Sequence, residues 1–129
     1  MSWTYEQISG RLIDPDGVAQ GFGYSGQPPH KNDPAAQNQV GIGPIPVGLW
    51  HATALIAVTE AHGPYVIVLT PDSATETFGR SGFLVHGDSL ERAGYASEGC
   101  IVQSRDVREM FWNSADHDIT VVARIGGLQ

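Results

Sequence analysis

The lone cysteine and a histidine that precedes it are the residues whose chemistry stands out. Cys100 follows residues 97–99 (Ser-Glu-Gly), and His86 lies fourteen positions before it (100 minus 86). A thiol with a pKa of about 8.5 is only slightly ionised at neutral pH, so a catalytic cysteine needs a nearby imidazole or helix N-terminus. The pairing therefore suggests a nucleophile and its general base.

The segments around these two residues favour a strand and a helix. Residues 83–85 (Phe-Leu-Val) lead into His86 and predict a buried central strand over Phe83–His86, which ends at Gly87 and Asp88. Ser104 is a good N-cap for a helix over Arg105–Trp112.

The predicted helix has its apolar residues Val107, Met110 and Phe111 at spacings of three and four. Cys100 precedes this helix, and if it lies near the helix N-terminus, the helix dipole favours its thiolate. The N–H groups around Gly99 and Cys100 could also stabilise an oxyanion.

The remaining pattern is typical of a mainly β protein. The turn 14–17 (Asp-Pro-Asp-Gly) predicts a hairpin, and residues 73–79 are ambiguous. Besides Phe83–His86, strands are predicted over Trp3–Leu12, Val18–Tyr24, Val47–Val58, Pro64–Thr70 and Ile119–Ile125. We expect a single domain over residues 1–129, folded as a mixed β-sandwich with one or two short helices.

Composition and charge exclude several classes of protein. A net charge of −7 argues against nucleic acid as a partner, and one cysteine excludes an internal disulfide and a cysteine-rich zinc site. The sequence has no stretch long and apolar enough to span a membrane, and its first residues lack the pattern of a signal peptide. We expect no membrane insertion and no Sec-dependent export.

Two glycine- and proline-rich segments need interpretation. Residues 21–26 match G-x-G-x-x-G, but Pro28 and Pro29 follow where that nucleotide-binding motif requires a helix, so we reject it. Residues 26–46 form a long connection with five prolines, which predicts either an ordered loop packed on the sheet or the wall of a cleft.

The order His86-Gly87-Asp88, a short loop, then Ser97-x-Gly99-Cys100-Ile101 resembles the catalytic signature of L,D-transpeptidases, which remodel peptidoglycan stem peptides. Further segments resemble the small branch of this superfamily used as antibacterial type VI secretion effectors. These segments are Trp3–Gly10, residues 23–26 (Gly-Tyr-Ser-Gly), residues 31–34 (Lys-Asn-Asp-Pro) and residues 43–48 (Gly-Pro-Ile-Pro-Val-Gly).

The resemblance implies that Cys100 is the nucleophile, His86 the general base, and the Gly87 carbonyl the group that orients the imidazole. Ser97 and Gly99 would shape the turn that presents the thiol.

The resemblance also leads us to predict substrate contacts. The residues expected to bind substrate are Ser97, Asp88, Arg80 and Tyr24. Many members have Arg or Asn two residues after the cysteine, where this chain has Val102, so Arg80, Arg92 or Asp88 would have to supply that polar support. The other possible roles are turn formation for Asp88, a solvated surface position for Arg80 and Arg92, and a core or cleft-wall position for Tyr24.

The implied activity is L,D-carboxypeptidase or L,D-transpeptidase chemistry at the bond between meso-diaminopimelate and D-alanine in tetrapeptide stems, without a cofactor. The implied partners are a cognate immunity protein and a carrier of the secretion apparatus, and delivery would be to the periplasm of a target bacterium.

Other interpretations remain open at this stage. His86 and Asp88 could join Cys100 in a zinc site, although no paired-cysteine or HExxH spacing supports it. A papain-like peptidase or amidase would have its histidine far after the cysteine, where this chain has only His117. A catalytically silent cell-wall binding module is the third alternative. The other histidines, His30, His51, His62 and His117, are interpreted as structural or exposed.

Overall fold

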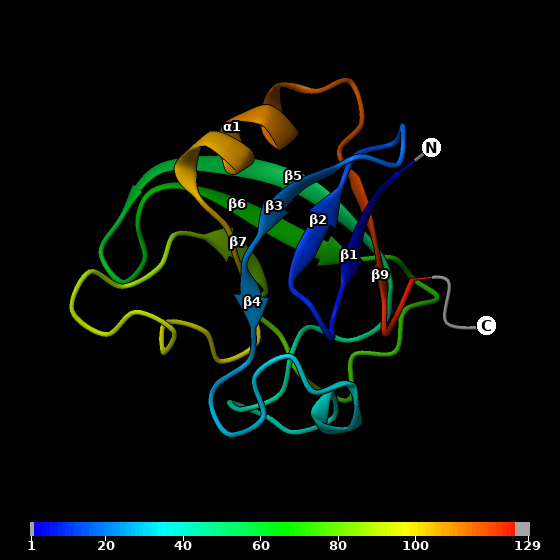
Figure 1. Cartoon of the computed structure of the whole chain (residues 1–129), viewed down its shortest axis with the longest axis vertical. Coiled ribbons are helices and arrows are strands. Elements are labelled where there is room, and N and C mark those ends of the chain that lie inside the picture. Colours follow the sequence, from blue (N-terminus) through cyan, green and yellow to red (C-terminus); the bar gives the residue numbers. More distant parts are fainter. Residues whose placement is uncertain (1, 126–129) are drawn as a thin grey trace.

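The structure, a computed structural model, describes residues 2–125. Its strands are β1 (Trp3–Glu6), β2 (Arg11–Ile13), β3 (Ala19–Phe22), β4 (Tyr24–Ser25), β5 (Gly48–Thr59), β6 (Gly63–Pro71), β7 (Leu84–His86), β8 (Ile101–Val102) and β9 (Asp118–Val122). They pair into one sheet in the order β3-β2-β1-β9-β5-β6-β7-β8-β4 (Figure 1). The pairs β1–β9 and β7–β8 are parallel and the others antiparallel.

The prediction of a mainly β fold with a mixed sheet and short helices is therefore confirmed, whereas the specific L,D-transpeptidase type of sandwich stays a prediction. Residue 1 and residues 126–129, which the single-domain prediction included, lie outside the described part of the chain.

The two edges of this sheet are consecutive in the sequence, because only Gly23 separates β3 from β4. Its N–H donates to the Gly10 carbonyl at 2.8 Å, and a Cβ there would lie 1.6 Å from the Val102 oxygen. Glycine is therefore required for the crossing. The sheet curls around its core and brings the two ends of the strand order together.

The N-terminal region differs from the prediction of one strand over Trp3–Leu12. The chain turns at residues 7–10, so β1 and β2 form an antiparallel pair of their own, and β2 pairs with β3 across the predicted turn 14–17. The Gly10 N–H donates to the Glu6 carbonyl at 2.9 Å and closes the first turn. The turn at 14–17 is confirmed, and an additional turn precedes it.

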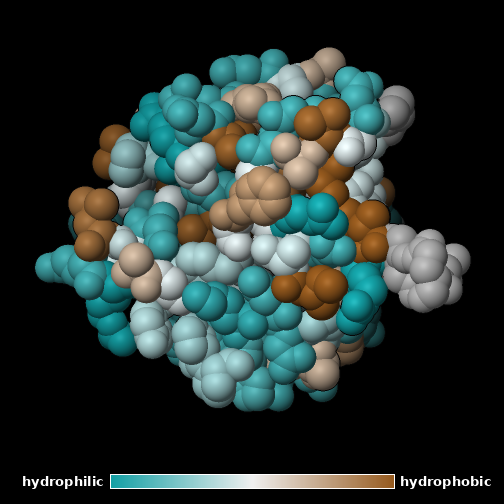
Figure 2. Space-filling model, in the orientation of Figure 1, coloured by the Kyte–Doolittle hydropathy of each residue, from teal (hydrophilic) through white to brown (hydrophobic). Residues whose placement is uncertain are grey.

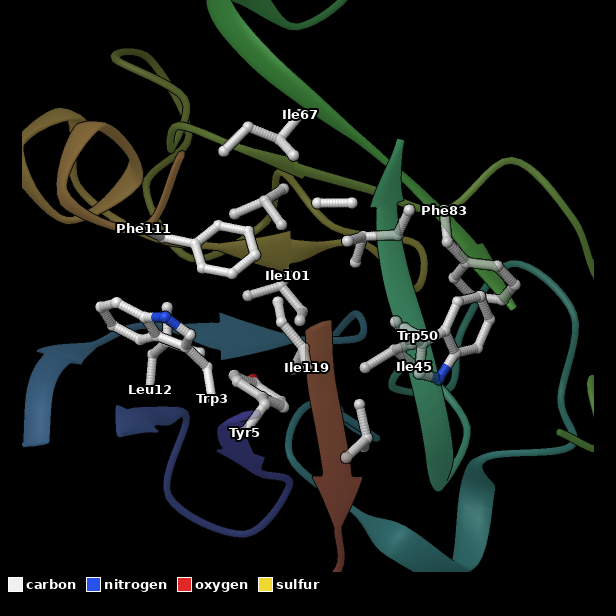
Figure 3. Close-up of a cluster of buried hydrophobic side chains, with 14 of the residues drawn as sticks. Trp3, Tyr5, Leu12, Ile45, Trp50, Ile67, Phe83, Ile101, Phe111 and Ile119 are labelled. Carbon is white, nitrogen blue, oxygen red and sulfur yellow. The ribbon is translucent and has the colours of Figure 1, made fainter. Parts of the chain in front are cut away.

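The core fills the inside of the curled sheet and is rich in aromatic residues (Figure 3). Trp3 packs edge-on against Phe111 at 5.4 Å between ring centroids, and Trp50 packs against Phe83 at 4.8 Å. Each such fully buried side chain stabilises the fold by roughly 1.5–3 kcal/mol. Phe83 borders the segment that carries His86, so core packing fixes that segment.

The predicted helix is present as α1 (Arg105–Asn113), and the Ser104 side chain accepts the Val107 N–H as expected of an N-cap. Val107 and Phe111 are buried, but Met110 is 43% exposed, and Arg108 is buried in its place. Arg108 can be buried because its guanidinium Nη1 donates to the Pro64 and Tyr65 carbonyls at 2.9 and 2.7 Å. The helix is thereby attached to the start of β6.

Residues 26–46 form an ordered loop with one short 3₁₀ helix, η1 (Pro34–Ala36). Ile45 is fully buried in the core, its N–H donates to Ser25 Oγ, and its carbonyl accepts from Gln7 Nε2, both at 2.8 Å. The predicted closing strand Ile119–Ile125 is present as β9, which ends earlier, at Val122.

The face visible in Figure 2 is mainly hydrophilic, with hydrophobic residues in small separate groups. In the described part of the chain, no helix combines the length and apolarity needed to cross a membrane.

Candidate active site

The sheet places His86 and Cys100 on neighbouring strands. His86 ends β7, which lies between β6 and β8, and Cys100 directly precedes β8. Val85 pairs with Ile101 and His86 with Val102 in parallel register, so Cys100 is level with Leu84. Residues level with each other in a sheet point to the same side, and so do residues two apart along a strand. Cys100 and His86 therefore share one face.

The imidazole of His86 has one fixed nitrogen and one free nitrogen. Nδ1 lies 2.8 Å from the Gly87 carbonyl oxygen, which can only accept, so Nδ1 carries the proton. Nε2 therefore presents its lone pair, and it is buried without a hydrogen-bond partner. The predicted role of the Gly87 carbonyl in orienting this ring agrees with the geometry.

His86 is neutral at ordinary pH in this environment. Burial lowers the pKa of His86, and although the hydrogen bond to Gly87 raises it, the nearby charges of His62 and Arg108 lower it further. A neutral imidazole with a free Nε2 can accept a proton, as a general base must.

Cys100 differs from the expectation of a thiolate favoured by the helix dipole. Burial raises the pKa of its thiol to about 11, with an opposing contribution from a hydrogen bond to the Leu84 backbone. Strand β8 lies between Cys100 and the helix N-cap Ser104, so the thiol does not directly precede the helix. Cys100 Sγ lies 3.7 Å from the Gly82 carbonyl oxygen, to which it donates a hydrogen bond.

The turn before Cys100 is held by one hydroxyl group. Ser97 Oγ donates to the Cys100 carbonyl at 2.6 Å and accepts the N–H groups of Gly99 and Gly26 at 3.1 and 3.0 Å. Ser97 is 0% exposed, and its donor and both acceptor positions are occupied. It shapes the turn, as predicted, and leaves no capacity for the substrate contact also predicted for it.

Gly99 cannot be replaced without strain. Its φ is +141°, and a Cβ would lie 2.3 Å from Arg80 Nη2. Its N–H is occupied by Ser97. The expectation that this N–H stabilises an oxyanion is therefore wrong, because Ser97 Oγ already accepts it.

Arg80 was expected on the surface or on a substrate carboxylate, but it is 7% exposed. Its two terminal nitrogens donate to four backbone carbonyls at 2.5–3.2 Å, those of Gln37, Gly43, Pro44 and Glu98. These bonds tie the 26–46 loop to the residue before Gly99. Val102 is itself buried in β8, and the prediction that Arg80 supplies the polar support in its place stays a prediction.

A cavity of about 450 Å³ opens between these segments. It is lined by Val40, Gly41, His62, Gly79, Arg80, Ser81, Gly82, Phe83, His86, Tyr95, Ala96, Glu98, Gly99 and Cys100. The 26–46 loop contributes Val40 and Gly41, so it is both an ordered loop and a wall of the cavity. Tyr24, Asp88 and Ser97 do not line it.

Asp88 and Tyr24 organise the loop on one side of the cavity. Tyr24 Oη donates to Asp88 Oδ1 at 2.5 Å and accepts the Ala96 N–H at 2.9 Å. Asp88 also accepts the N–H groups of Ser89 and Gly94. These contacts support the interpretation of Asp88 as a turn former.

His62, which sequence reasoning assigned to the structural or exposed histidines, lies in the site. Its ring stacks on that of His86 with 4.4 Å between centroids and 24° between planes. It is separated from His86 by 24 residues (86 minus 62) with no connecting motif, and only the β5–β6 hairpin brings it there.

No group of three His, Cys, Asp or Glu residues between positions 2 and 125 is arranged to hold a metal ion. The alternative of a zinc site at His86, Asp88 and Cys100 therefore has no support in the geometry.

A curled mixed sheet that presents a cysteine and a histidine to one cavity defines a candidate cysteine enzyme. Residues 20–125 match the family model of the Tlde1 domain, and the chain belongs to this family of type VI secretion effectors. Membership supports an effector with peptidoglycan-related activity. No curated protein and no solved structure matched the chain significantly.

Proposed function

We propose that this protein is an antibacterial effector that cleaves or exchanges the terminal D-alanine of peptidoglycan tetrapeptide stems through a thioester on Cys100. The observation that carries the proposal is that His86, whose Nε2 has no hydrogen-bond partner among the described residues, lines the same cavity as Cys100. We also propose that the fold is a β-sandwich of the L,D-transpeptidase type.

The first half-reaction forms the thioester. His86 Nε2 takes the thiol proton as Cys100 Sγ attacks the carbonyl carbon of the L-centre of meso-diaminopimelate. The tetrahedral intermediate collapses as the C–N bond breaks, and His86 gives the proton to the departing amine of D-alanine. The raised pKa of the thiol suits proton transfer during attack rather than a preformed ion pair.

The second half-reaction releases the acyl group. Water or the amine of a D-amino acid or another stem loses a proton to His86 Nε2 and attacks the thioester carbon. The C–S bond then breaks, and the proton returns to Cys100. Water gives carboxypeptidase trimming, a D-amino acid gives exchange, and a stem amine gives a 3-3 crosslink. No metal or organic cofactor takes part in these steps.

The charges of the cavity suit an amine-bearing stem. Among the residues described, Glu98 is the one carboxylate that lines the cavity. The other charged lining residue, Arg80, already donates to backbone carbonyls. The side-chain ammonium of diaminopimelate can pair with Glu98. Trimming or exchange would deprive normal crosslinking of donor stems, so the producer needs an immunity protein, and delivery uses a secretion carrier.

The test is incubation with purified tetrapeptide muropeptides, with and without D-methionine, followed by mass spectrometry. Loss of one alanine mass indicates trimming, and replacement of alanine by methionine indicates exchange. Cys100→Ala should abolish both products, while Cys100→Ala that keeps turnover would move the reaction to another site. Cleavage of a different wall peptide bond would instead indicate an amidase, and binding without turnover a silent module.

A further inference from the structure

We infer that His62 is a positioning residue for His86, which holds the general base in its productive orientation and couples the base to a second ionisable ring. The inference rests on the function proposed above for His86. His62 covers one face of the His86 imidazole, with 4.4 Å between ring centroids and nearly parallel planes.

The fold holds His62 in place through the tip of the β5–β6 hairpin. The His62 N–H donates to Thr59 Oγ1 at 2.9 Å, and that hydroxyl donates to the Gly63 carbonyl at 2.9 Å. One threonine therefore fixes the backbone on both sides of His62.

The helix also supports this arrangement. Arg108 from α1 donates to the carbonyls of Pro64 and Tyr65, just after the hairpin tip. The same guanidinium packs on Gly87, where a Cβ would lie 2.9 Å from Nη2. Arg108 thus lies against both the residues that follow His62 and Gly87, the residue whose carbonyl orients His86.

His62 also stands between two cavities. It lines the cavity that holds Cys100 and a second one of about 550 Å³, which His86, Tyr95 and Ala96 share as well. A smaller residue at position 62 would join these spaces, give the His86 ring room to rotate, and admit water to its face.

Charged or ionisable side chains face His86 from three elements of the fold. His62 faces it from the hairpin, Arg108 from α1 and Asp88 from the segment that follows β7, while Cys100 shares its cavity. Positive charge on His62 or Arg108 opposes protonation of His86, whereas Asp88 favours it. Of these groups, His62 is the one whose ring also stacks on that of His86, so it acts on the base through both charge and contact.

Three variants separate the positioning effect from the electrostatic effect. His62→Phe keeps an aromatic ring but removes the charge, and His62→Ala removes both. His30→Phe is the matched control, because the His30 ring bonds Asp33 at 3.3 Å and lines none of the three cavities found among the described residues.

The first readout is an NMR titration of the ¹⁵N-labelled His86 side chain, which needs no substrate. We expect the pKa of His86 to rise in His62→Phe, because the repulsion is gone, and in His62→Ala, because water also reaches the ring. His30→Phe should match the wild type. An unchanged His86 titration in both His62 variants would overturn the inference.

The second readout is turnover of muropeptides. We expect kcat to fall about tenfold or more in His62→Ala with little change in KM, because a displaced base slows the chemical step. His62→Phe should keep kcat within a few-fold and shift the acid limb of its pH profile to higher pH. Wild-type kcat in a folded His62→Ala protein would contradict the positioning role. An inactive wild type would refute the proposed function instead, and the NMR result would still decide on the stack.

Discussion

His86 and Cys100 reach one cavity from differently supported segments. His86 lies on β7, which is paired on both sides, and its ring is fixed by the carbonyl of the next residue. Cys100 ends a loop, which Ser97 and Arg80 hold through side-chain hydrogen bonds to backbone far away in the sequence. Strand register therefore places the base, whereas a few buried polar side chains place the nucleophile. Single substitutions should displace the thiol more readily than the imidazole.

The largest effect is expected from removing the base without disturbing its strand. His86→Gln should lower kcat on muropeptides by about 10³-fold, because a positioned general base contributes roughly 10²–10⁴-fold. Its melting temperature should stay close to that of the wild type at pH 8, where His86 is uncharged. A folded variant with near wild-type kcat would assign the base to another residue.

The next effect concerns the reactivity of the thiol itself. With the pKa of Cys100 raised to about 11, alkylation by iodoacetamide should be slow at pH 7 and keep rising beyond pH 9. The rate at pH 7 should be about 100-fold below that of an unperturbed cysteine, because so little thiolate is present. A reactivity plateau near neutral pH would instead indicate a preformed thiolate, with His86 as its positive partner.

Arg80→Lys tests the support of the cysteine loop. An ammonium group cannot reach the carbonyls that the guanidinium joins, so the free energy of unfolding should fall by about 2–4 kcal/mol. Turnover should also fall, while the NMR tautomer of His86 stays the same, because its strand does not depend on Arg80. Urea unfolding measures the first effect.

Arg92→Lys is the matched control for that experiment. Arg92 is exposed and lies over the Tyr95 ring at 5.0 Å, so the change should cost less than about 0.5 kcal/mol. Equal losses in both variants would show that Arg80 has no special role in holding the loop.

The smallest effect is expected far from the cavity, at His51 on β5. Hydrogen bonds first to Asp118 and then to Asp72 raise its pKa, so its contribution to stability is present at acid pH and lost as pH rises through that pKa. His86 has the opposite sign, since its lowered pKa makes stability fall as pH drops below about 6.5.

The two histidines can be distinguished by urea unfolding between pH 5 and pH 8. As pH rises toward 8, the wild type should lose less than about 1 kcal/mol of stability at His51, because this histidine and its carboxylate partners are mostly solvated. His51→Gln should remove that pH-dependent loss. His86→Gln should remove the loss of stability that the wild type shows as pH falls toward 5. The same pH dependence in both variants would contradict these assignments.

The sequence could predict the part of the site that is built from residues close together in the chain. Gly87 is adjacent to His86, and Ser97 and Gly99 lie within three positions of Cys100, so their local roles follow from short motifs. The helix after Ser104 was predictable because its cap and apolar spacing are local signals. The turn at 7–10 could also have been found, since Ser9-Gly10 is a turn dipeptide.

The rest depends on long-range geometry. Arg80 bonds backbone carbonyls, and because every residue carries one, no sequence pattern marks its partners. Arginine is also usually exposed, so its burial was not expected. His62 reaches His86 only through the length of the β5–β6 hairpin and the register of β6 with β7. The expectation of a lowered Cys100 pKa was wrong, because burial at the cavity wall raises that pKa.

The most direct test of the central claim is to trap the acyl-enzyme. The wild-type protein is mixed with tetrapeptide muropeptide, quenched in acid within the first turnover, digested and analysed by mass spectrometry. The account predicts that the peptide containing Cys100 gains the mass of the stem acyl group without its terminal alanine, and that Cys100→Ser gains no thioester. D-alanine release by Cys100→Ala at the wild-type rate, with no adduct on the wild-type cysteine, would contradict it.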